Sequence, residues 1–184
     1  MVKATEKTNT KPININIMAT ENLSNKQAIE KLKEIAEKAR VCMMNTSLDQ
    51  RPIPTRPMTL KEVDEEGRMW FISSKKSDKN FQLQKDAALQ LTFMNTSKSE
   101  YLSVYGKASI YTDQKHIDEH WSIMANAWFD GKEDDDISII AVKASDIKYW
   151  DTKHGKIVDM ATMAYSAITG DRSVDAGVSG KLTV

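Results

Sequence analysis

The feature that most constrains the fold of this chain is the alternation of apolar and polar residues over Tyr101–Tyr111. A period of two residues places the apolar side chains on one face of a β-strand. Gly106 falls on that apolar face, so a bulge or a close backbone approach is expected there. Similar runs predict further strands at Val41–Thr46, Arg51–Val63, Arg68–Ser73 and Ala88–Met94, and one long strand or a bent pair over Ile137–Val142 and Ile147–Trp150.

Helices are expected beside and between these strands. From Ser24 to about Arg40, apolar residues recur every three or four positions, and Ser24 with Gln27 has the spacing of a capping box. Shorter helices are predicted over Asp78–Lys85, from an N-cap at Asp113 to about Ala125, and over Asp159–Thr169. Strands at hairpin spacing with helices at their ends predict an α+β fold, in which about six antiparallel strands form a barrel with flanking helices.

The chain is expected to form one folded domain between two tails, because its 184 residues suit a single domain. Residues 1–22 are polar and lack a hydrophobic period, which predicts an N-terminal tail. Residues 23–152 contain the predicted strands and form the barrel domain. Residues 153–184 are expected to be a C-terminal helix followed by a tail rich in Gly, Ser and Asp.

The balance of charge and the lack of long apolar runs argue against several classes of function. The chain has 26 Lys and Arg residues and 26 Asp and Glu residues, so its formal net charge is zero. A general nucleic-acid binder would carry a basic footprint, so any anion site here must be local. The N-terminus lacks the apolar region of a secretory signal, and no run approaches the roughly 18 apolar residues of a membrane span. We therefore expect a cytoplasmic protein that binds neither nucleic acid nor membrane.

The segment RPIPTRPMTL, Arg51–Leu60, holds three of the four prolines of the chain. Proline cannot donate to a strand ladder, so this segment does not suit the centre of a sheet. We expect it at an edge or an opening, where the prolines fix the backbone. Arg56 within it is a permanent cation with a fork of donors that suits carboxylate or phosphate.

A second segment, residues 73–79, has the sequence SSKKSDK between a predicted strand and a predicted helix. Hydroxyls, lysines and free N–H groups at a helix start form a cradle for an anion. With Arg56 from a neighbouring strand, the cradle suits a dianionic phosphate. A solvated lysine loop is the alternative that the residues alone leave open.

Other chemistry-bearing residues fit structural roles better. His116 and His120 lie four residues apart, but Ile117 stands where a zinc protease motif has its glutamate, so two surface histidines are expected rather than a metal site. Cys42 lies in an apolar strand, which indicates a buried thiol. The acidic run Glu133–Asp136 lacks the pattern of a calcium loop. The sequence contains neither a G-x-G-x-x-G motif nor a phosphate-binding G-K-[ST] loop.

Several pieces of the chain match one family in order and spacing. They are RPM (56–58), MWFIS (69–73), SDKNFQL (77–83), YLSVYGKASI (101–110), the predicted helix with Trp121, WFDGKEDDD (128–136), YWD (149–151) and AITG (167–170) before GKLTV. From about Ser24 to its end, the chain resembles the general stress protein 26 branch of the pyridoxamine 5′-phosphate oxidase-like, FMN-binding split-barrel family. The resemblance implies a six-stranded split barrel that works as a homodimer, with FMN at the subunit interface.

The resemblance also implies roles for individual residues. By motif position, Arg56, Ser77 and Lys79 are similar to the contacts of the FMN phosphate in this family. The residues implied to line the isoalloxazine ring are Pro57, Met58, Phe71, Ile72 and Ser73, with Trp150 near the flavin of the partner subunit.

Two departures limit what the resemblance implies about activity. The arginine-bearing C-terminal segment of true pyridoxamine phosphate oxidases has no match in SGKLTV, and Tyr101 stands where those enzymes carry a polar amide. Oxidation of a B6 vitamer is therefore not expected. The leading hypothesis is a flavin-dependent oxidoreductase of unknown substrate. A non-catalytic flavin carrier or redox-stress sensor is the alternative, and a barrel that binds haem or a deazaflavin is the third.

Overall fold

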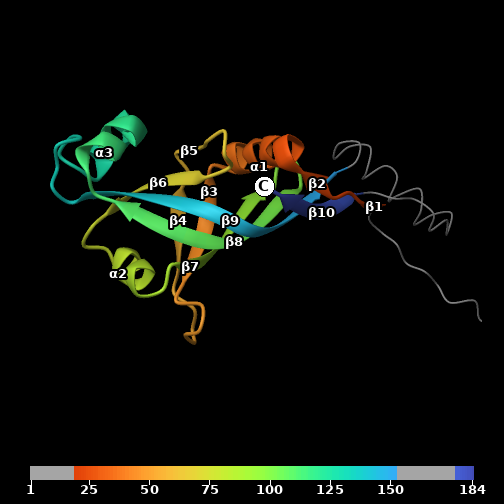
Figure 1. The fold of residues 1–184 in the computed structure, drawn as a ribbon, viewed down its shortest axis with the longest axis horizontal. Coiled ribbons are helices and arrows are strands. Elements are labelled where there is room, and N and C mark those ends of the chain that lie inside the picture. The colour runs from red at the N-terminus through yellow and green to blue at the C-terminus, as the bar shows by residue number, and fades with distance from the viewer. Residues whose placement is uncertain (1–18, 153–176) are drawn as a thin grey trace, which may run out of the picture.

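The computed structural model describes residues 19–152 and 177–184 of the protein. Within them the fold is α+β, as predicted, with helices packed around one twisted sheet (Figure 1). The helices are α1 (Asn25–Ala39), α2 (Asp78–Lys85), α3 (Gln114–His120) and the 3-10 helix η1 (Ile123–Ala127). The strands are β1 (Ala19–Thr20), β2 (Leu23–Ser24), β3 (Val41–Thr46), β4 (Thr55–Thr59), β5 (Glu62–Val63), β6 (Met69–Ser74), β7 (Ala88–Asn95), β8 (Glu100–Tyr111), β9 (Ile137–Asp151) and β10 (Val178–Thr183).

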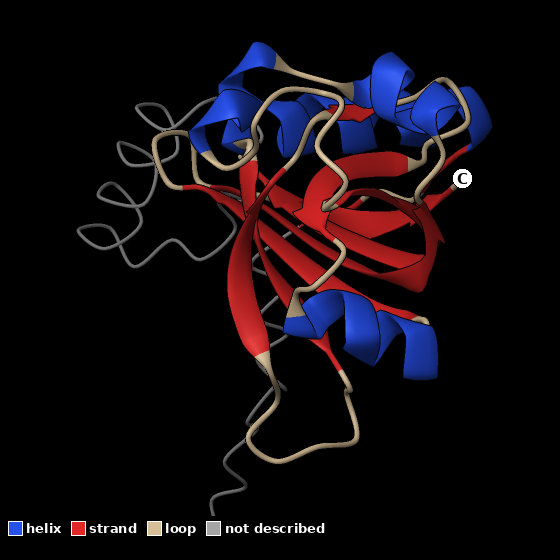
Figure 2. Ribbon diagram, turned by 90° about the vertical axis from the view of Figure 1, so that its left-hand side faces the viewer, coloured by secondary structure: helices blue, strands red, loops and turns tan. Residues whose placement is uncertain are grey.

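The sheet is mixed and open. Its main path runs β1-β10-β9-β8-β7-β3-β4, and β6 pairs with the N-terminal half of β9 while β10 pairs with the C-terminal half. The pairs among β3, β4, β6, β7, β8 and β9 are antiparallel, whereas β1 and β2 each run parallel to β10. Figure 2 shows how strongly the strands curl around the interior. The predicted six-stranded antiparallel barrel is therefore not confirmed, because the described residues form a mixed sheet of ten strands that does not close.

The proline-rich segment lies at one edge of the sheet, as its sequence predicts. The expected strand Arg51–Val63 divides into a loop, β4 and β5, and the Arg51–Pro52 peptide in the loop is cis. Pro57 lies in β4 opposite Met43, and β4 has β3 as its hydrogen-bonded neighbour at the end of the sheet path. An edge strand tolerates proline because one side of its ladder needs no donor.

The core fills the space between α1 and the inner face of the sheet. On α1 the buried residues recur at three- and four-residue spacing, and in the strands every second residue points inward. Together they form one large cluster that includes Leu32, Ile35, Phe71, Phe93 and Tyr149. This cluster fixes β4 and β6 on the two sides of the opening that is described below.

Two sequence predictions of turns and caps are confirmed, and one is not. The register between β8 and β9 shifts at Tyr105/Gly106, which is the bulge expected from the glycine. The Asp113 carboxylate accepts a hydrogen bond from the backbone N–H of His116 and begins α3. Ser24 is the N-cap of α1, but its side chain makes no capping hydrogen bond.

The ends of the chain differ most from expectation. Residues 178–183 were expected within a tail, yet they form β10 and lie in the sheet against β9. Short strands at Ala19–Thr20 and Leu23–Ser24 pair with β10, so part of the expected N-terminal tail also joins the sheet. The predicted helix Asp159–Thr169 lies outside the described residues. No helix in the described part of the chain is long and apolar enough to cross a membrane.

Candidate functional site

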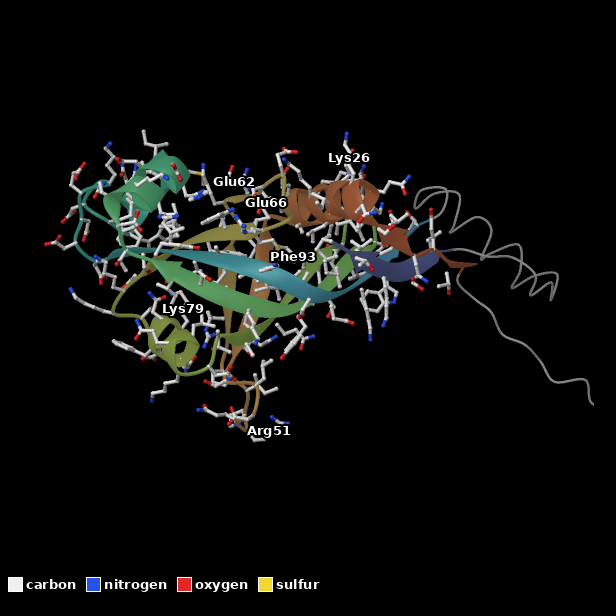
Figure 3. All side chains as sticks on the ribbon, in the orientation of Figure 1. Lys26, Arg51, Glu62, Glu66, Lys79 and Phe93 are labelled. Atoms are coloured by element: carbon white, nitrogen blue, oxygen red, sulfur yellow. The ribbon has the colours of Figure 1, made fainter. Side chains whose placement is uncertain are left out.

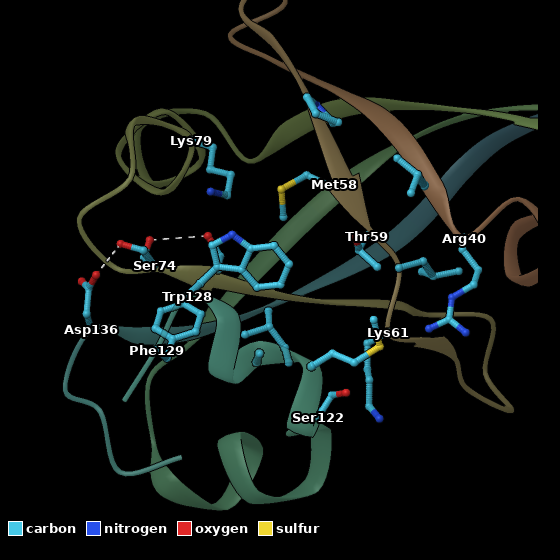
Figure 4. A pocket seen from close by; sticks show the side chains of 17 residues that line it. Arg40, Met58, Thr59, Lys61, Ser74, Lys79, Ser122, Trp128, Phe129 and Asp136 are labelled. Carbon is cyan, nitrogen blue, oxygen red and sulfur yellow. Dashed lines mark hydrogen bonds between the residues drawn. The ribbon is translucent and has the colours of Figure 1, made fainter. Parts of the chain in front are cut away.

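A cleft of about 730 Å³ opens between the edge strand β4, strand β6 and the segment that follows α3 (Figure 4). Its volume lies in the range that binds cofactors and other small ligands. The residues that line it are Arg40, Val41, Pro57, Met58, Thr59, Leu60, Lys61, Ile72, Ser73, Ser74, Lys79, Ser122, Met124, Ala125, Trp128, Phe129 and Asp136. Of the nine residues predicted to bind the cofactor, Pro57, Met58, Ile72, Ser73 and Lys79 line this cleft, and Arg56, Phe71, Ser77 and Trp150 do not.

Two cations from different elements lie near one end of the cleft: Lys79 lines the cleft from α2, and Arg56 of β4, which does not line it, donates to Gln82 of the same helix. Lys79 in the first turn of α2 is half-buried, and burial followed by the charge of Arg56 lowers the pKa of its ammonium. Burial also lowers the pKa of the Arg56 guanidinium, while the carboxylate of Asp78 raises the pKa of both groups. The ammonium of Lys79 makes no hydrogen bond or ion pair with any residue in ranges 19–152 and 177–184. Two half-buried cations, one of which lowers the pKa of the other, favour an anion nearby.

Arg56 is held in place by its own hydrogen bonds. One terminal nitrogen of the guanidinium donates to Thr46 Oγ1 at 2.6 Å, and the other donates to Gln82 Oε1 at 2.9 Å. A guanidinium has five N–H donors, so these bonds orient it and leave further donors for a ligand. The other arginine of the segment, Arg51, donates to the carbonyls of Leu48 and Gln50 at the tip of the β3–β4 loop, away from Lys79 (Figure 3).

A buried network fixes the turn between β6 and α2. Ser73 Oγ donates to Asn80 Oδ1 at 3.0 Å, and Asn80 Nδ2 donates to Ser138 Oγ at 2.6 Å. Ser77 Oγ donates to the carbonyl of Ser74 at 2.7 Å, so this hydroxyl supports the turn rather than the cleft. Because buried polar groups that are satisfied in this way resist movement, the network sets where Lys79 points.

The anion cradle predicted from residues 73–79 forms only in part. The backbone N–H of Lys75 donates to the carbonyl of Asp136, and that of Lys76 donates to the Asp136 carboxylate. These two donors are thus occupied. The backbone N–H groups of Asp78 and Lys79 lie in the first turn of α2, where an α-helix leaves its donors unsatisfied, and neither has a partner among the described residues.

The middle of the cleft is apolar. Pro57 and Met58 contribute one side from β4, and Ile72 contributes the other from β6. Phe71 differs from expectation, because alternation along β6 turns its side chain into the core, where it is fully buried. Only the main chain of Phe71 could therefore contact a ring in the cleft.

One wall of the cleft was not predicted from the sequence. Ser122, Met124, Ala125, Trp128 and Phe129 line it, and they belong to the segment that begins where α3 ends. The sequence predicted one helix from Asp113 to about Ala125, whereas α3 stops at His120 and Trp121 has an extended backbone. A methionine and a tryptophan within the uncharged stretch from Ser122 to Phe129 are the sequence signal that could have found this wall.

The two histidines make contacts that fix α3 in place. His120 is buried, which corrects the expectation of a surface residue: its ring stacks on Trp70 with centroids 3.8 Å apart, and its Nδ1 lies 2.7 Å from Glu62 Oε1. His116 stacks on Tyr111 and contacts the Asp113 carboxylate. The described residues contain no cluster of His, Cys, Asp or Glu that could hold a metal ion.

Cys42 is a structural thiol, as predicted. It is buried in the core cluster, and burial raises the pKa of its thiol to about 12. A thiol that stays protonated at neutral pH is a poor nucleophile. Cys42 therefore supplies no reactive thiolate to the cleft.

Trp150 lies on the outer face of the sheet, apart from the cleft of its own chain. It pairs across the ladder with Tyr101, and Tyr101 pairs with Met94 on the next strand. Val41 continues this row on β3, beside the Cys42–Phe93 pair. All four side chains are more than a third exposed, with values of 48% for Val41, 52% for Met94, 38% for Tyr101 and 36% for Trp150. We call this set the outer row.

Comparison with known proteins places the chain in a family. The sequence model of the family described as "Pyridoxamine 5'-phosphate oxidase like" matches residues 27–175. Protein bli-3 of Neurospora crassa is 28% identical over 126 residues, which are 63% of this chain and 60% of that protein. The chain therefore spans less than two thirds of the length of this relative.

Solved structures share the fold. A candidate general stress protein 26 of Jannaschia sp. CCS1 has a TM-score of 0.66 and 23% identity, with 86% of this chain and 96% of that chain covered. The general stress FMN/FAD-binding protein of Xanthomonas citri has a TM-score of 0.60 and 22% identity, with 69% and 90% covered. At such identities the likeness concerns the fold alone. Because the family model covers most of the sequence, this chain belongs to the pyridoxamine 5′-phosphate oxidase-like family.

Proposed function

We propose that this protein binds FMN in the cleft and works as a flavin-dependent oxidoreductase. The observation that carries the proposal is that Lys79, a half-buried cation at one end of the cleft, feels the charge of the half-buried Arg56, which is held against the same helix by Gln82, while the middle of the cleft is apolar. FMN has the matching shape, with a dianionic phosphate at one end and a flat ring system at the other. The Xanthomonas citri protein with the same fold is named for FMN and FAD binding, which supports a flavin as ligand.

In this proposal the chain supplies binding and orientation. Arg56 and Lys79 hold the phosphate together with the free amides of Asp78 and Lys79, while Ser77 supports the turn. Pro57, Met58, Ile72 and Ser73 face the ring system, with the main chain of Phe71 behind them. The flavin supplies the hydride and electron chemistry when it is bound.

The same phosphate site predicts a pH dependence of FMN affinity. The affinity should fall below about pH 6, where the phosphate monoester gains its second proton. It should also fall on the alkaline side, at a pH below that of an ordinary lysine, because the pKa of Lys79 is lowered. Fluorescence titrations of FMN across this range measure both limbs. Lys79→Arg keeps its charge and should lose the alkaline fall, so an identical alkaline fall in this variant would contradict the role of Lys79.

We also propose a homodimer in which the flavin lies at the subunit interface. The outer row crosses four strands and leads to Thr59, which pairs with Val41, and both of these residues line the cleft. A row of exposed apolar side chains that runs into a cleft suits an interface that continues it. In such a dimer Trp150 would approach the flavin of the partner.

The dimer has a direct test. Tyr101→Arg places a charge in the middle of the outer row, so the mass measured by light scattering should change from two chains to one, and FMN should be lost with it. Ile123→Arg is the matched control, because Ile123 is an exposed apolar residue outside the row. A Tyr101→Arg protein that remains a dimer would refute the interface.

A second candidate function is a flavin carrier or redox-stress sensor without turnover. Asp136, a carboxylate that lines the cleft, accepts hydrogen bonds from Ser74 Oγ and from the backbone N–H of Lys76, so it holds the turn rather than standing free as a general base. This suits either flavin hydride transfer or simple carriage. Adding NADH or NADPH to the FMN-loaded protein without oxygen separates the two. An oxidoreductase should lose its flavin absorbance with either donor and regain it on adding an acceptor. A flavin that neither donor reduces favours the carrier.

A further inference from the structure

The wall formed by the segment after α3 carries unusual exposed apolar surface. Ile123, Met124 and Trp128 are 79%, 63% and 74% exposed, more than any other large hydrophobic residue among those the structure describes. Met124 and Trp128 line the cleft, whereas Ile123 does not. Exposed apolar side chains that gather in a concavity indicate a binding surface rather than a chance exposure.

The geometry of η1 aims part of this wall at the cleft. Ser122 precedes the 3-10 helix η1, Ala125 lies within it and Trp128 follows it. The backbone N–H of Ala125 donates to the carbonyl of Ser122 and that of Trp128 to the carbonyl of Ala125, so the three residues are linked at the three-residue spacing of such a helix. All three line the cleft, and Figure 4 shows the Trp128 indole extending from this segment toward Met58. The small methyl group of Ala125 leaves space between the Ser122 hydroxyl and the Trp128 indole.

The chemistry of the wall selects a class of ligand. From Ser122 to Phe129 the sequence is SIMANAWF, which contains no charged residue. An indole stacks on flat rings, and a thioether adapts to their edges. A charged group against this wall would be desolvated without a partner. The wall therefore differs from the Lys79 end of the cleft, where an anion is favoured.

We propose that Met124, Ala125 and Trp128 form a second site in the cleft that takes a flat, uncharged ring of the quinone class, with Trp128 as its stacking platform. The inference rests on the proposed function, since such a ring would be the partner of the flavin in the same cleft. Arg40 and Lys61 lie exposed at the margin of the cleft, and an acidic ligand held by them is the competing occupant that the test must distinguish.

The test is a titration of the FMN-loaded protein with menadione and with its anionic counterpart, 1,4-naphthoquinone-2-sulfonate. Trp128→Leu keeps an apolar side chain but removes the ring, so menadione affinity should fall about five- to tenfold while FMN affinity stays within about twofold. Ile123→Leu changes an equally exposed residue of η1 outside the cleft and should leave both affinities unchanged. Because Trp128 is exposed, its replacement should not alter folding, which circular dichroism checks.

Each other outcome overturns the inference. Unchanged menadione affinity in Trp128→Leu would show that Trp128 is not the stacking platform. A loss of FMN affinity as large as the loss of menadione affinity would assign Trp128 to the flavin instead. Tighter binding of the sulfonate that disappears in Arg40→Ala makes the site one for anions. If the wild-type protein holds no FMN, the proposed function fails, and the same menadione titration of the flavin-free protein and of Trp128→Leu still decides whether the wall binds a flat ring.

Discussion

Replacing Arg56 by alanine is expected to lower the affinity for FMN about 10- to 150-fold, and replacing Lys79 should have an effect of the same order. A hydrogen bond to a charged group contributes roughly 1.5–3 kcal/mol, and each 1.4 kcal/mol corresponds to about a tenfold change in affinity. The two cations share one site, so the double variant should bind FMN too weakly to copurify with it. Quenching of FMN fluorescence on titration with protein measures all three affinities.

The chain offers matched controls for both residues. Arg51 belongs to the same proline-rich segment but donates only to carbonyls of its own loop. Lys76 belongs to the same turn as Lys79 but is exposed and lies near Asp136. Arg51→Ala and Lys76→Ala should bind FMN as the wild type does. If these two variants lose as much affinity as Arg56→Ala and Lys79→Ala, a diffuse positive field rather than a built site holds the flavin.

Adding a single methyl group at Gly106 should destabilise the fold by about 2–3 kcal/mol, the upper part of the range for overpacking a closed site. A Cβ at this position would lie 2.4 Å from the Lys143 carbonyl oxygen and 3.1 Å from the Ala144 Cα. Both are backbone atoms at the bulge between β8 and β9, so no side-chain rotation relieves the contact. For a chain of this size, the melting temperature of Gly106→Ala should fall by about 5–10 °C.

A neighbouring position of the same strand provides the control. Ser109 is exposed on β8, so Ser109→Ala should change the free energy of unfolding by less than about 0.5 kcal/mol. Thermal unfolding followed by circular dichroism compares the two variants directly. A Gly106→Ala protein as stable as Ser109→Ala would mean that β8 and β9 do not approach each other this closely.

Most of the strands were predictable because their signal is local. In β7, Leu89, Leu91 and Phe93 alternate with polar residues, and all three are buried in the core. The bounds of α2 were predicted to the residue, since a strand ends and a helix begins within a few polar residues. Such periodicity requires no knowledge of what lies across the sheet.

β10 could not be predicted in the same way, because its stability comes from distant residues. Gly180 lies opposite Tyr149, and a Cβ there would lie 1.7 Å from the carbonyl oxygen of Glu21. The Tyr149 hydroxyl donates to that same carbonyl. The glycine that made the segment look like a tail is thus what allows three separate stretches of chain to meet.

The two cations of the candidate site were predictable from the sequence, and the opposite wall of the cleft was not. Arg56 and Lys79 have side chains whose chemistry is evident in isolation, and the structure brings their charges together. The role of Trp128 depends on where α3 stops, and α3 stops at a residue fixed by long-range contacts of His120 with Glu62 and Trp70. No local pattern in the sequence contains those contacts.

The most direct test of the central claim compares FMN with riboflavin, which has the same ring system and no phosphate. Isothermal titration of the flavin-free protein with each ligand measures the contribution of the phosphate alone. If Arg56 and Lys79 grip that phosphate, FMN should bind at least about 100-fold more tightly than riboflavin, since two charge-assisted contacts are lost. Equal affinities for the two flavins would contradict the account.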